Sequence, residues 1–205
     1  MSVGLEDIAI FSPLPRYGLE AWWNTYTHIP LPWVRTFGPD YWKQQRYGDR
    51  HGPDRYEQLQ LEDFILIAAL KELALPDDSF LDIGSGTGRH LKVLRKSGYS
   101  HIYGVDVRPC REEAMFVADF ADWLPHVTCE FDLVFTFGMT IELVPPSVPI
   151  CHHMARIAKK AVVLMVFERG CPYPRLWKQE FERENMMLTK YEPHGQMGLF
   201  VFERR

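Results

Sequence analysis

A glycine-rich segment offers the clearest potential for chemistry in this sequence. It reads Asp82-Ile83-Gly84-Ser85-Gly86-Thr87-Gly88, and an apolar run over residues 79–83 leads into it. Glycines at such a junction permit a tight turn and let a ligand approach the backbone closely. If a helix follows the loop, its first N–H groups favour an anionic group of the ligand. The segment therefore predicts a ligand-binding loop, and glycines that serve only a tight turn are the structural alternative.

A carboxylate lies at the distance from this loop that nucleoside recognition requires. Asp106 comes 20 residues after Gly86, at the end of the apolar segment 101–107. An acid at the end of a second strand can accept hydrogen bonds from both ribose hydroxyls. A dinucleotide fingerprint would need glycine where Arg89 stands, and the glycine loop also departs from the P-loop pattern. This spacing disfavours a nicotinamide-dependent dehydrogenase.

Alternating segments place the loop in an α/β domain with a mainly parallel sheet. We expect strands at 79–83, 101–107, 131–137, 161–167, 186–191 and 197–202, the last two joined as an antiparallel hairpin through 193–195. We expect helices at 56–75, 89–97, 147–160 and 175–185, with Ser147 as the cap of the third. The first of these helices is predicted to be mostly buried, including Phe64 and Ala68.

In these features the sequence resembles the class I S-adenosylmethionine-dependent methyltransferases. Residues 81–88 look like their motif I, residues 104–107 look like the acidic end of their second strand, and the resemblance covers roughly residues 56–205. It implies a Rossmann-like fold with a mainly parallel seven-stranded sheet and a C-terminal antiparallel hairpin. It also implies S-adenosylmethionine as the cofactor.

The resemblance carries the family's cofactor contacts onto particular residues. Gly84, Gly86 and Gly88 would line the methionine half of the cofactor, and Asp106 would bind its ribose. The other residues implied at this site are Asp82 and Ser85 in the loop, Val107 and Arg108 beside the adenine, and Asp119 at the adenine amine. For Asp119 an ordinary surface carboxylate in a loop is an equal alternative.

One interval departs from the family pattern. Only 25 residues separate Asp106 from Asp132, where family members usually place a helix, a strand and another helix. One or both helices must therefore be short or missing. One face of the sheet is then less covered, and the N-terminal arm or a partner chain, including a second copy in a homo-oligomer, could fill it.

We interpret residues 1–55 as an arm or lid and residues 56–205 as the methyltransferase domain. Residues 11–56 hold four of the six tryptophans, five of the nine tyrosines and six prolines, a composition typical of short helices and loops. Trp42, Arg46 and Tyr47 resemble a segment that closes over the cofactor in some small-molecule methyltransferases. A guanidinium suits the cofactor's carboxylate, and aromatic faces suit its sulfonium. Packing of Trp42 and solvation of Arg46 are the alternative.

A base for the methyl acceptor is expected past the end of the fourth strand, where open α/β sheets bind ligands. Glu142 is the local candidate, with a carboxylate at a helix start as its alternative, and His126 and His28 are further possibilities. Cys151-His152-His153 looks like a metal triplet, but adjacent helical residues do not face one site. We therefore expect no metal and assign Cys151 to an apolar stripe.

Composition narrows the function further. The chain has 205 residues with 46% hydrophobic and 24% charged side chains, which is ordinary for one globular domain. A net charge of −4 makes nucleic acid an unlikely partner, and the sequence offers neither a membrane-spanning run nor a secretory signal. We expect a cytoplasmic enzyme that methylates an O or N atom of a small biosynthetic molecule. The alternative is a cofactor-binding, non-catalytic structural or regulatory subunit.

Overall fold

The computed structural model describes residues 58–107, 115–144, 146–169, 171, 173 and 175–205. The predicted arm, with Trp42, Arg46, Tyr47 and His28, lies outside the described residues, and so does Arg108. Among the described helices, none is long and apolar enough to cross a membrane.

Seven strands form a single sheet in the order β3-β2-β1-β4-β5-β7-β6. Neighbouring strands from β3 to β5 run parallel, whereas β7 is antiparallel to both β5 and β6. The strands are β1 Phe80–Ile83, β2 Ile102–Asp106, β3 Met115–Val117, β4 Phe131–Phe137, β5 Ala158–Phe167, β6 Met186–His194 and β7 Met197–Arg204. The sheet confirms the predicted fold class, including the C-terminal antiparallel hairpin.

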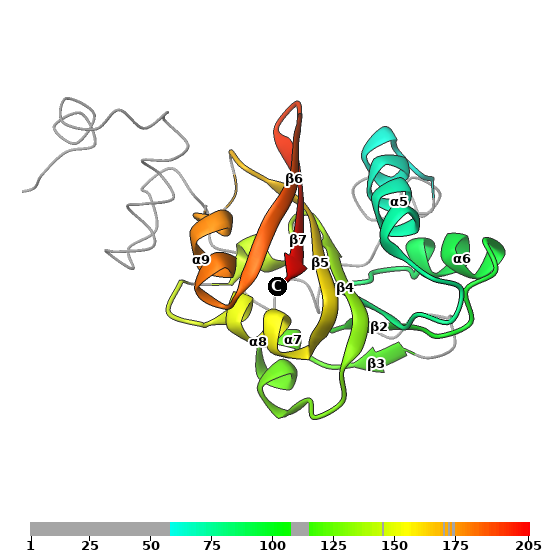
Figure 1. The fold of residues 1–205 in the computed structure, drawn as a ribbon, viewed down its shortest axis with the longest axis horizontal. Coiled ribbons are helices and arrows are strands. Elements are labelled where there is room, and N and C mark those ends of the chain that lie inside the picture. Colours follow the sequence, from blue (N-terminus) through cyan, green and yellow to red (C-terminus); the bar gives the residue numbers. More distant parts are fainter. Residues whose placement is uncertain (1–57, 108–114, 145, 170, 172, 174) are drawn as a thin grey trace, which may run out of the picture.

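Helices cover both faces of this sheet, as Figure 1 shows. Helices α5 (Leu61–Leu73) and α6 (Arg89–Lys96) lie on one side, and α7 (Phe120–Trp123), α8 (Ile150–Ile157) and α9 (Trp177–Arg183) lie on the other. Successive strand residues point to opposite faces. Leu133 and Phe135 therefore join the core under α5 and α6, whereas Val134 between them joins the core under α8 and α9.

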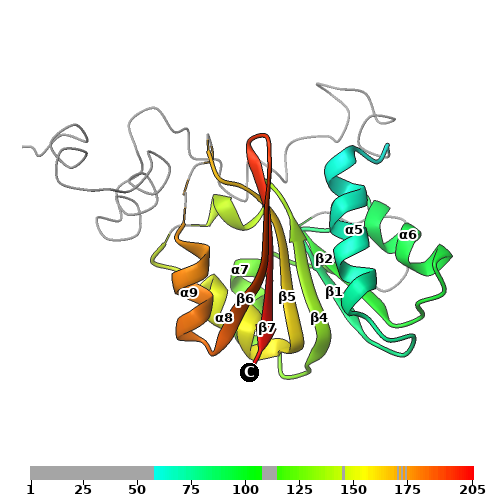
Figure 2. The ribbon, with the colours of Figure 1, turned by 45° about the horizontal axis from the view of Figure 1, so that its top comes forward.

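The parallel strands end at one common edge, which we call the carboxyl edge. Residues Gly84 and Ser85 leave β1 there and donate their N–H groups to the Val105 carbonyl of β2, at 2.8 and 3.1 Å. The β6–β7 turn reaches the same edge, because Phe167 at the end of β5 pairs with Met197. Figure 2 shows this hairpin tip beside the ends of β4 and β5.

Several details of the helices differ from the sequence-based predictions, among them the end of the third helix, since residues 158–160 belong to β5. Helix α8 begins at Ile150 with Pro149 as its N-cap, so the prediction of Ser147 as the cap is wrong. The proline disfavours helical geometry in the residue before it, and this delays the helix by three residues. Helix α5 turns Phe64 and Ala68 to the surface, because Leu66, Ile67 and Leu70 face the sheet instead.

The interval between β2 and β4 is short in the structure as well. Within its described residues it holds the three-residue strand β3, the four-residue helix α7 and the 3₁₀ turn η1 (Leu124–His126). Phe116 and Val117 on β3 are exposed, and the Phe116 ring lies 5.0 Å from the ring of Trp123. Among the residues that the structure describes, this end of the sheet therefore carries less helical cover than the rest.

Gly84 gives the fold a testable point, because a Cβ there would overlap the Thr140 side chain and its φ is +73°. Gly84→Ala should lower the unfolding free energy by about 3 kcal/mol, from left-handed strain and overpacking together. Gly195→Ala is the matched control, because its φ is +62° and nothing lies within 4 Å of its Cβ position. We expect that control to cost about 1–2 kcal/mol.

Urea unfolding followed by tryptophan fluorescence measures both losses. Adding Thr140→Ala to Gly84→Ala should recover part of the loss, because the clashing methyl and hydroxyl groups are then gone. Equal losses at the two glycines would contradict this packing of the loop.

Candidate functional site

The glycine loop is held at the carboxyl edge by its own backbone. Gly88 donates its N–H to the Ser85 carbonyl at 2.9 Å and then serves as the N-cap of α6 with φ of +74°. The side chain of Ser85 packs toward β3, with its Oγ 3.0 Å from the Met115 sulfur. Strand, loop and helix thus follow one another as the sequence predicts, and the first turn of α6 starts at the loop.

Asp106 lies against this loop. Its carboxylate is buried, and its Oδ2 accepts the N–H of Gly86 at 2.9 Å. The register explains the approach, since Ile83 pairs with Val105 and both strands then end. The structure therefore brings together Asp82, the loop glycines and Asp106, and Val107 follows directly at the same edge.

Asp82 is a fully buried carboxylate beside the loop. It lies on β1, two residues before Gly84, and it has no exposed surface. Its Oδ2 lies 3.3 Å from Nδ1 of His90, whereas its Oδ1 has no hydrogen-bond partner among the described residues. A buried carboxylate oxygen without a partner is costly, and it fits a ligand that brings a hydrogen-bond donor or a cation. The amino acid part of S-adenosylmethionine carries such a group.

His90, which contacts Asp82, and Asp63, which contacts His90, were not among the residues predicted from the sequence. His90 Nε2 lies 2.6 Å from Oδ1 of Asp63 on α5, and Arg89 Nη2 lies 2.7 Å from the same oxygen. Arg89 also stacks on the ring of Phe137, 5.0 Å from its centroid. This side chain is thus held by both Asp63 and Phe137. One feature of the sequence could have indicated this pair. Asp63 is a carboxylate on the apolar face of its helix, which it shares with Leu66, Ile67 and Leu70.

The charges of these buried groups depend on one another. Burial by itself lowers the pKa of His90, but hydrogen bonds and charges from Asp63 and Asp82 outweigh it and raise that pKa above 6.5. Burial raises the pKa of Asp63, but His90, the Gln60 N–H and Arg89 together hold it below 3.8. Both shifts favour a cationic imidazole between two carboxylates.

Glu142, the predicted base, is occupied by the backbone. It is fully buried in the turn η2 (Ile141–Leu143), where its Oε2 accepts the N–H of Thr140 at 3.0 Å. Its Oε1 accepts the N–H groups of Met139 at 3.2 Å and of Phe167 at 2.7 Å. Burial raises the pKa of this carboxyl, although these backbone donors oppose the rise. Glu142 therefore ties the loop after β4 to the end of β5, and its role as a base stays a prediction.

The remaining candidates are placed by their elements. Asp119 caps α7 by accepting the N–H of Ala121 at 3.1 Å, and it stays beside the site because the Ala118 N–H bonds the Asp106 carbonyl at 2.9 Å. His126 ends η1, which Arg156 ties to the last turn of α8, so it lies toward the opposite edge of the sheet.

The apparent metal triplet is divided between the core and the surface. Cys151 is buried in the core under α8, as the apolar stripe predicts. His152 is exposed and its Nδ1 pairs with Glu184 at 2.8 Å. Among the described residues, no cluster of three His, Cys, Asp or Glu side chains is arranged to hold a metal ion.

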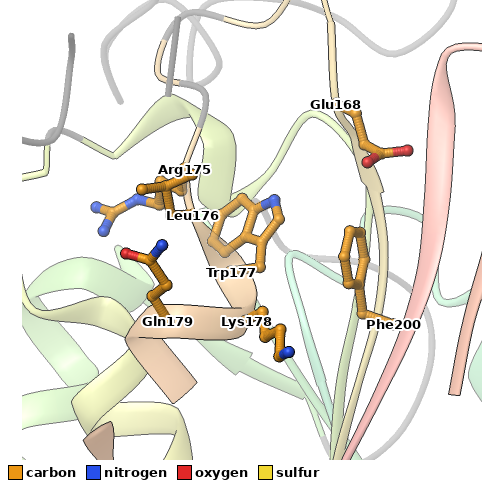
Figure 3. A pocket seen from close by; sticks show the side chains of 7 residues that line it. All are labelled: Glu168, Arg175, Leu176, Trp177, Lys178, Gln179 and Phe200. Carbon is orange, nitrogen blue, oxygen red and sulfur yellow. The ribbon is translucent and has the colours of Figure 1, made fainter. Parts of the chain in front are cut away.

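A small hollow lies next to the end of β5, with a volume of about 140 Å³. Figure 3 shows the Trp177 ring of α9 facing Phe200 of β7, with the Glu168 carboxylate near both. Arg175 fixes one wall, because its guanidinium bonds Glu180 at 2.7 Å and the carbonyls of Val144 and Val148 at 3.1 and 3.2 Å. Two aromatic rings, Trp177 and Phe200, line the hollow together with Leu176 and several polar side chains, and Glu168 supplies its carboxylate.

Glu168 is the half-buried acid of this hollow. Its two oxygens lie 3.1 and 3.0 Å from the hydroxyl of Tyr191, which donates to them. Burial raises the pKa of Glu168, and the Tyr191 hydrogen bond and the charge of Arg169 offset only part of that rise. Glu168 therefore combines access to the hollow with a raised pKa. The pKa of Glu142 is also raised, but its side chain is fully buried.

Solved structures that resemble this fold include several methyltransferases. Magnesium protoporphyrin IX methyltransferase from Synechocystis, solved with bound S-adenosylmethionine, matches at 14% identity and a TM-score of 0.60, over 95% of this chain and 99% of its own. An amino pentose methyltransferase from Micromonospora echinaspora matches at 14% identity and a TM-score of 0.59, over 79% and 99% of the two chains. Ribosomal protein L11 methylase from Lactobacillus delbrueckii matches at 13% identity and a TM-score of 0.54, over 70% and 77%. At these identities the likeness establishes the fold.

The family follows from the sequence itself. No curated protein sequence matches the chain. A family model described as a methyltransferase domain matches residues 54–197, which is more than half of the chain. The chain therefore belongs to this methyltransferase family, and it is an S-adenosylmethionine-dependent enzyme of the class I fold.

Proposed function

We propose that the protein transfers a methyl group from S-adenosylmethionine to an O or N atom of a small-molecule acceptor. The observation that carries the proposal is the pairing, at one sheet edge, of the Asp106-bound glycine loop with a small aromatic hollow. When bound, S-adenosylmethionine supplies an electrophilic methyl group on a sulfonium centre. The chain's own contribution is to bind and orient both molecules and to exclude water.

Some of the proposed cofactor contacts rest on residues that the structure describes, and the others rest on the resemblance to class I methyltransferases. Asp106 is buried at the end of β2 and suits ribose hydroxyls, while the unpartnered oxygen of Asp82 suits an ammonium group. Val107 and Asp119 follow β2 and β3 at the same edge. Trp42, Arg46, Tyr47 and Arg108 lie outside the described residues, and their proposed roles as lid and adenine neighbour rest on the resemblance alone.

The acceptor side of the proposal uses the hollow between Trp177 and Phe200. Its volume of about 140 Å³ suits a ring-sized group. Glu168 can accept a proton or a hydrogen bond from an acceptor hydroxyl or amine placed there. Two of the similar structures act on small molecules by their names, a porphyrin and an amino pentose, which is compatible with this acceptor class.

Removal of the Asp106 carboxylate tests the cofactor contact. Asp106→Ala should weaken binding of S-adenosylmethionine at least about tenfold, because a charged hydrogen bond of roughly 1.5–3 kcal/mol is lost. Calorimetric titration measures this loss. Asp77→Ala is the control, because Asp77 is an exposed acid in the turn before β1, at the opposite edge. Unchanged affinity in a folded Asp106→Ala protein would contradict the site.

Substitution of Glu168 tests the acceptor side. Release of S-adenosylhomocysteine should be detected with small aromatic or sugar-like amines and alcohols, and not with RNA or ribosomal protein. With an acceptor that is methylated, Glu168→Gln should lower kcat about tenfold or more, because no carboxylate is then present to take the proton of the acceptor. The affinity for the cofactor should stay unchanged. Methylation of RNA or protein alone, or full kcat in the variant, would overturn this part.

The predicted lid offers a third test in the full-length protein. Arg46→Ala should weaken S-adenosylmethionine binding about tenfold, because a bidentate pair with the cofactor's carboxylate is removed. Lys43→Ala, which removes a neighbouring positive charge, should leave the affinity within about twofold. If both variants bind equally well, Arg46 is a solvated charge and has no role as a lid residue.

A further inference from the structure

A row of buried charges connects α5 to the glycine loop. His90 stands between two carboxylates, with Nε2 at 2.6 Å from Asp63 Oδ1 and Nδ1 at 3.3 Å from Asp82 Oδ2. Arg89 joins the row at its outer end, 2.7 Å from Asp63. Asp63 in turn accepts the Gln60 N–H at 2.7 Å, at the N-cap of α5. The row thus ties the start of one helix to the residue that precedes the loop.

The position of His90 fixes its charge state. A neutral imidazole has one donor and one acceptor nitrogen, so it can donate to only one of two facing carboxylates. Asp63 and Asp82 are the acids that face the ring, and Arg89 pairs with Asp63 on its outer side. The rings of Phe135 and Phe137 lie 6.1 and 5.3 Å from it and shield it from water. Both nitrogens therefore carry protons, and the cation holds both acids at once.

Only one oxygen of Asp82 is engaged by this arrangement. Oδ2 faces the imidazolium, and Oδ1 stays buried without a partner among the described residues. If Oδ2 were released, the carboxylate could rotate about its χ2 torsion, which is a broad well for aspartate. His90 therefore determines where Oδ1 of Asp82 points, although His90 itself would not touch the ligand.

We propose that His90 and Asp63 are positioning residues, which hold Asp82 so that its Oδ1 receives the ammonium group of the cofactor. The inference rests on the proposed cofactor site at the glycine loop. The affinity for the cofactor would then depend on the charge of His90 and on the position of α5, which carries Asp63. Both features lie outside motif I.

Binding of S-adenosylhomocysteine as a function of pH tests the proposal. His90→Gln keeps a polar side chain but loses the charge, and it should bind roughly tenfold more weakly at about pH 7. The ratio of the variant and wild-type dissociation constants cancels the titration of the ligand. This ratio should fall toward one as pH rises through the raised pKa of His90, where the wild type also loses its imidazolium.

Stability gives a second readout without any ligand. A group with a raised folded-state pKa stabilises the fold below its unfolded pKa, and this contribution is lost as pH rises through the folded-state pKa. The difference in unfolding free energy between wild type and His90→Gln should therefore shrink with rising pH. Ring ¹⁵N shifts of His90 should show a doubly protonated ring at about pH 6.5, where an ordinary histidine is about half neutral, and a neutral ring there would overturn the proposal.

Controls separate this inference from the function on which it rests. His152→Gln, an exposed histidine paired with Glu184, should change neither affinity nor its pH dependence. If His90→Gln does not fold, Arg89→Gln removes the outer ion pair with Asp63 and leaves His90 in place, and it should weaken binding in the same direction, by about threefold. Wild-type binding with unchanged affinity in the folded variants would overturn the inference alone. No binding by the wild type, with Asp106→Ala alongside, would instead overturn the cofactor site.

Discussion

The fit of the glycine turn between its neighbours is the constraint on which this site depends. Gly84 has no room for a Cβ because Thr140 from the β4 loop fills that space. The next glycine donates its N–H to Asp106 from β2, so the turn is gripped from both neighbouring strands. A backbone held this closely has little freedom to rearrange, and its N–H groups are in place before a ligand arrives.

Charge is distributed at the carboxyl edge so that each carboxylate has a separate task. Glu142 is consumed by backbone donors and fixes the loop that presses on Gly84. Asp82 is held by His90 on one oxygen, and Asp106 is held by a glycine N–H. Glu168 lies apart from these three, at the aromatic hollow, where burial raises its pKa. In the proposed function, the cofactor site at the β1–β2 ends and the acceptor site at the β5 end thus lie apart along one edge.

The parts that local sequence determines were predictable, and the parts made by distant contacts were not. The strand, loop and helix around Gly86 follow from residues adjacent in sequence, and the 20-residue spacing placed Asp106. The contacts of Glu142 depend on Phe167, which is 25 residues away. The sequence shows only a glutamate at this position, and it does not distinguish a catalytic base from a carboxylate that binds backbone N–H groups. Asp63 and His90 are 27 residues apart, and only an acid in an apolar stripe hinted at the pair.

A crystal structure of the full-length protein with S-adenosylhomocysteine would test the central claim most directly. The account predicts the ribose hydroxyls within hydrogen-bond distance of Asp106 and the ammonium group at Oδ1 of Asp82. It also predicts the sulfur facing the side of the hollow lined by Trp177 and Phe200. A ligand bound elsewhere, or one that leaves Asp82 and Asp106 without contact, would contradict it.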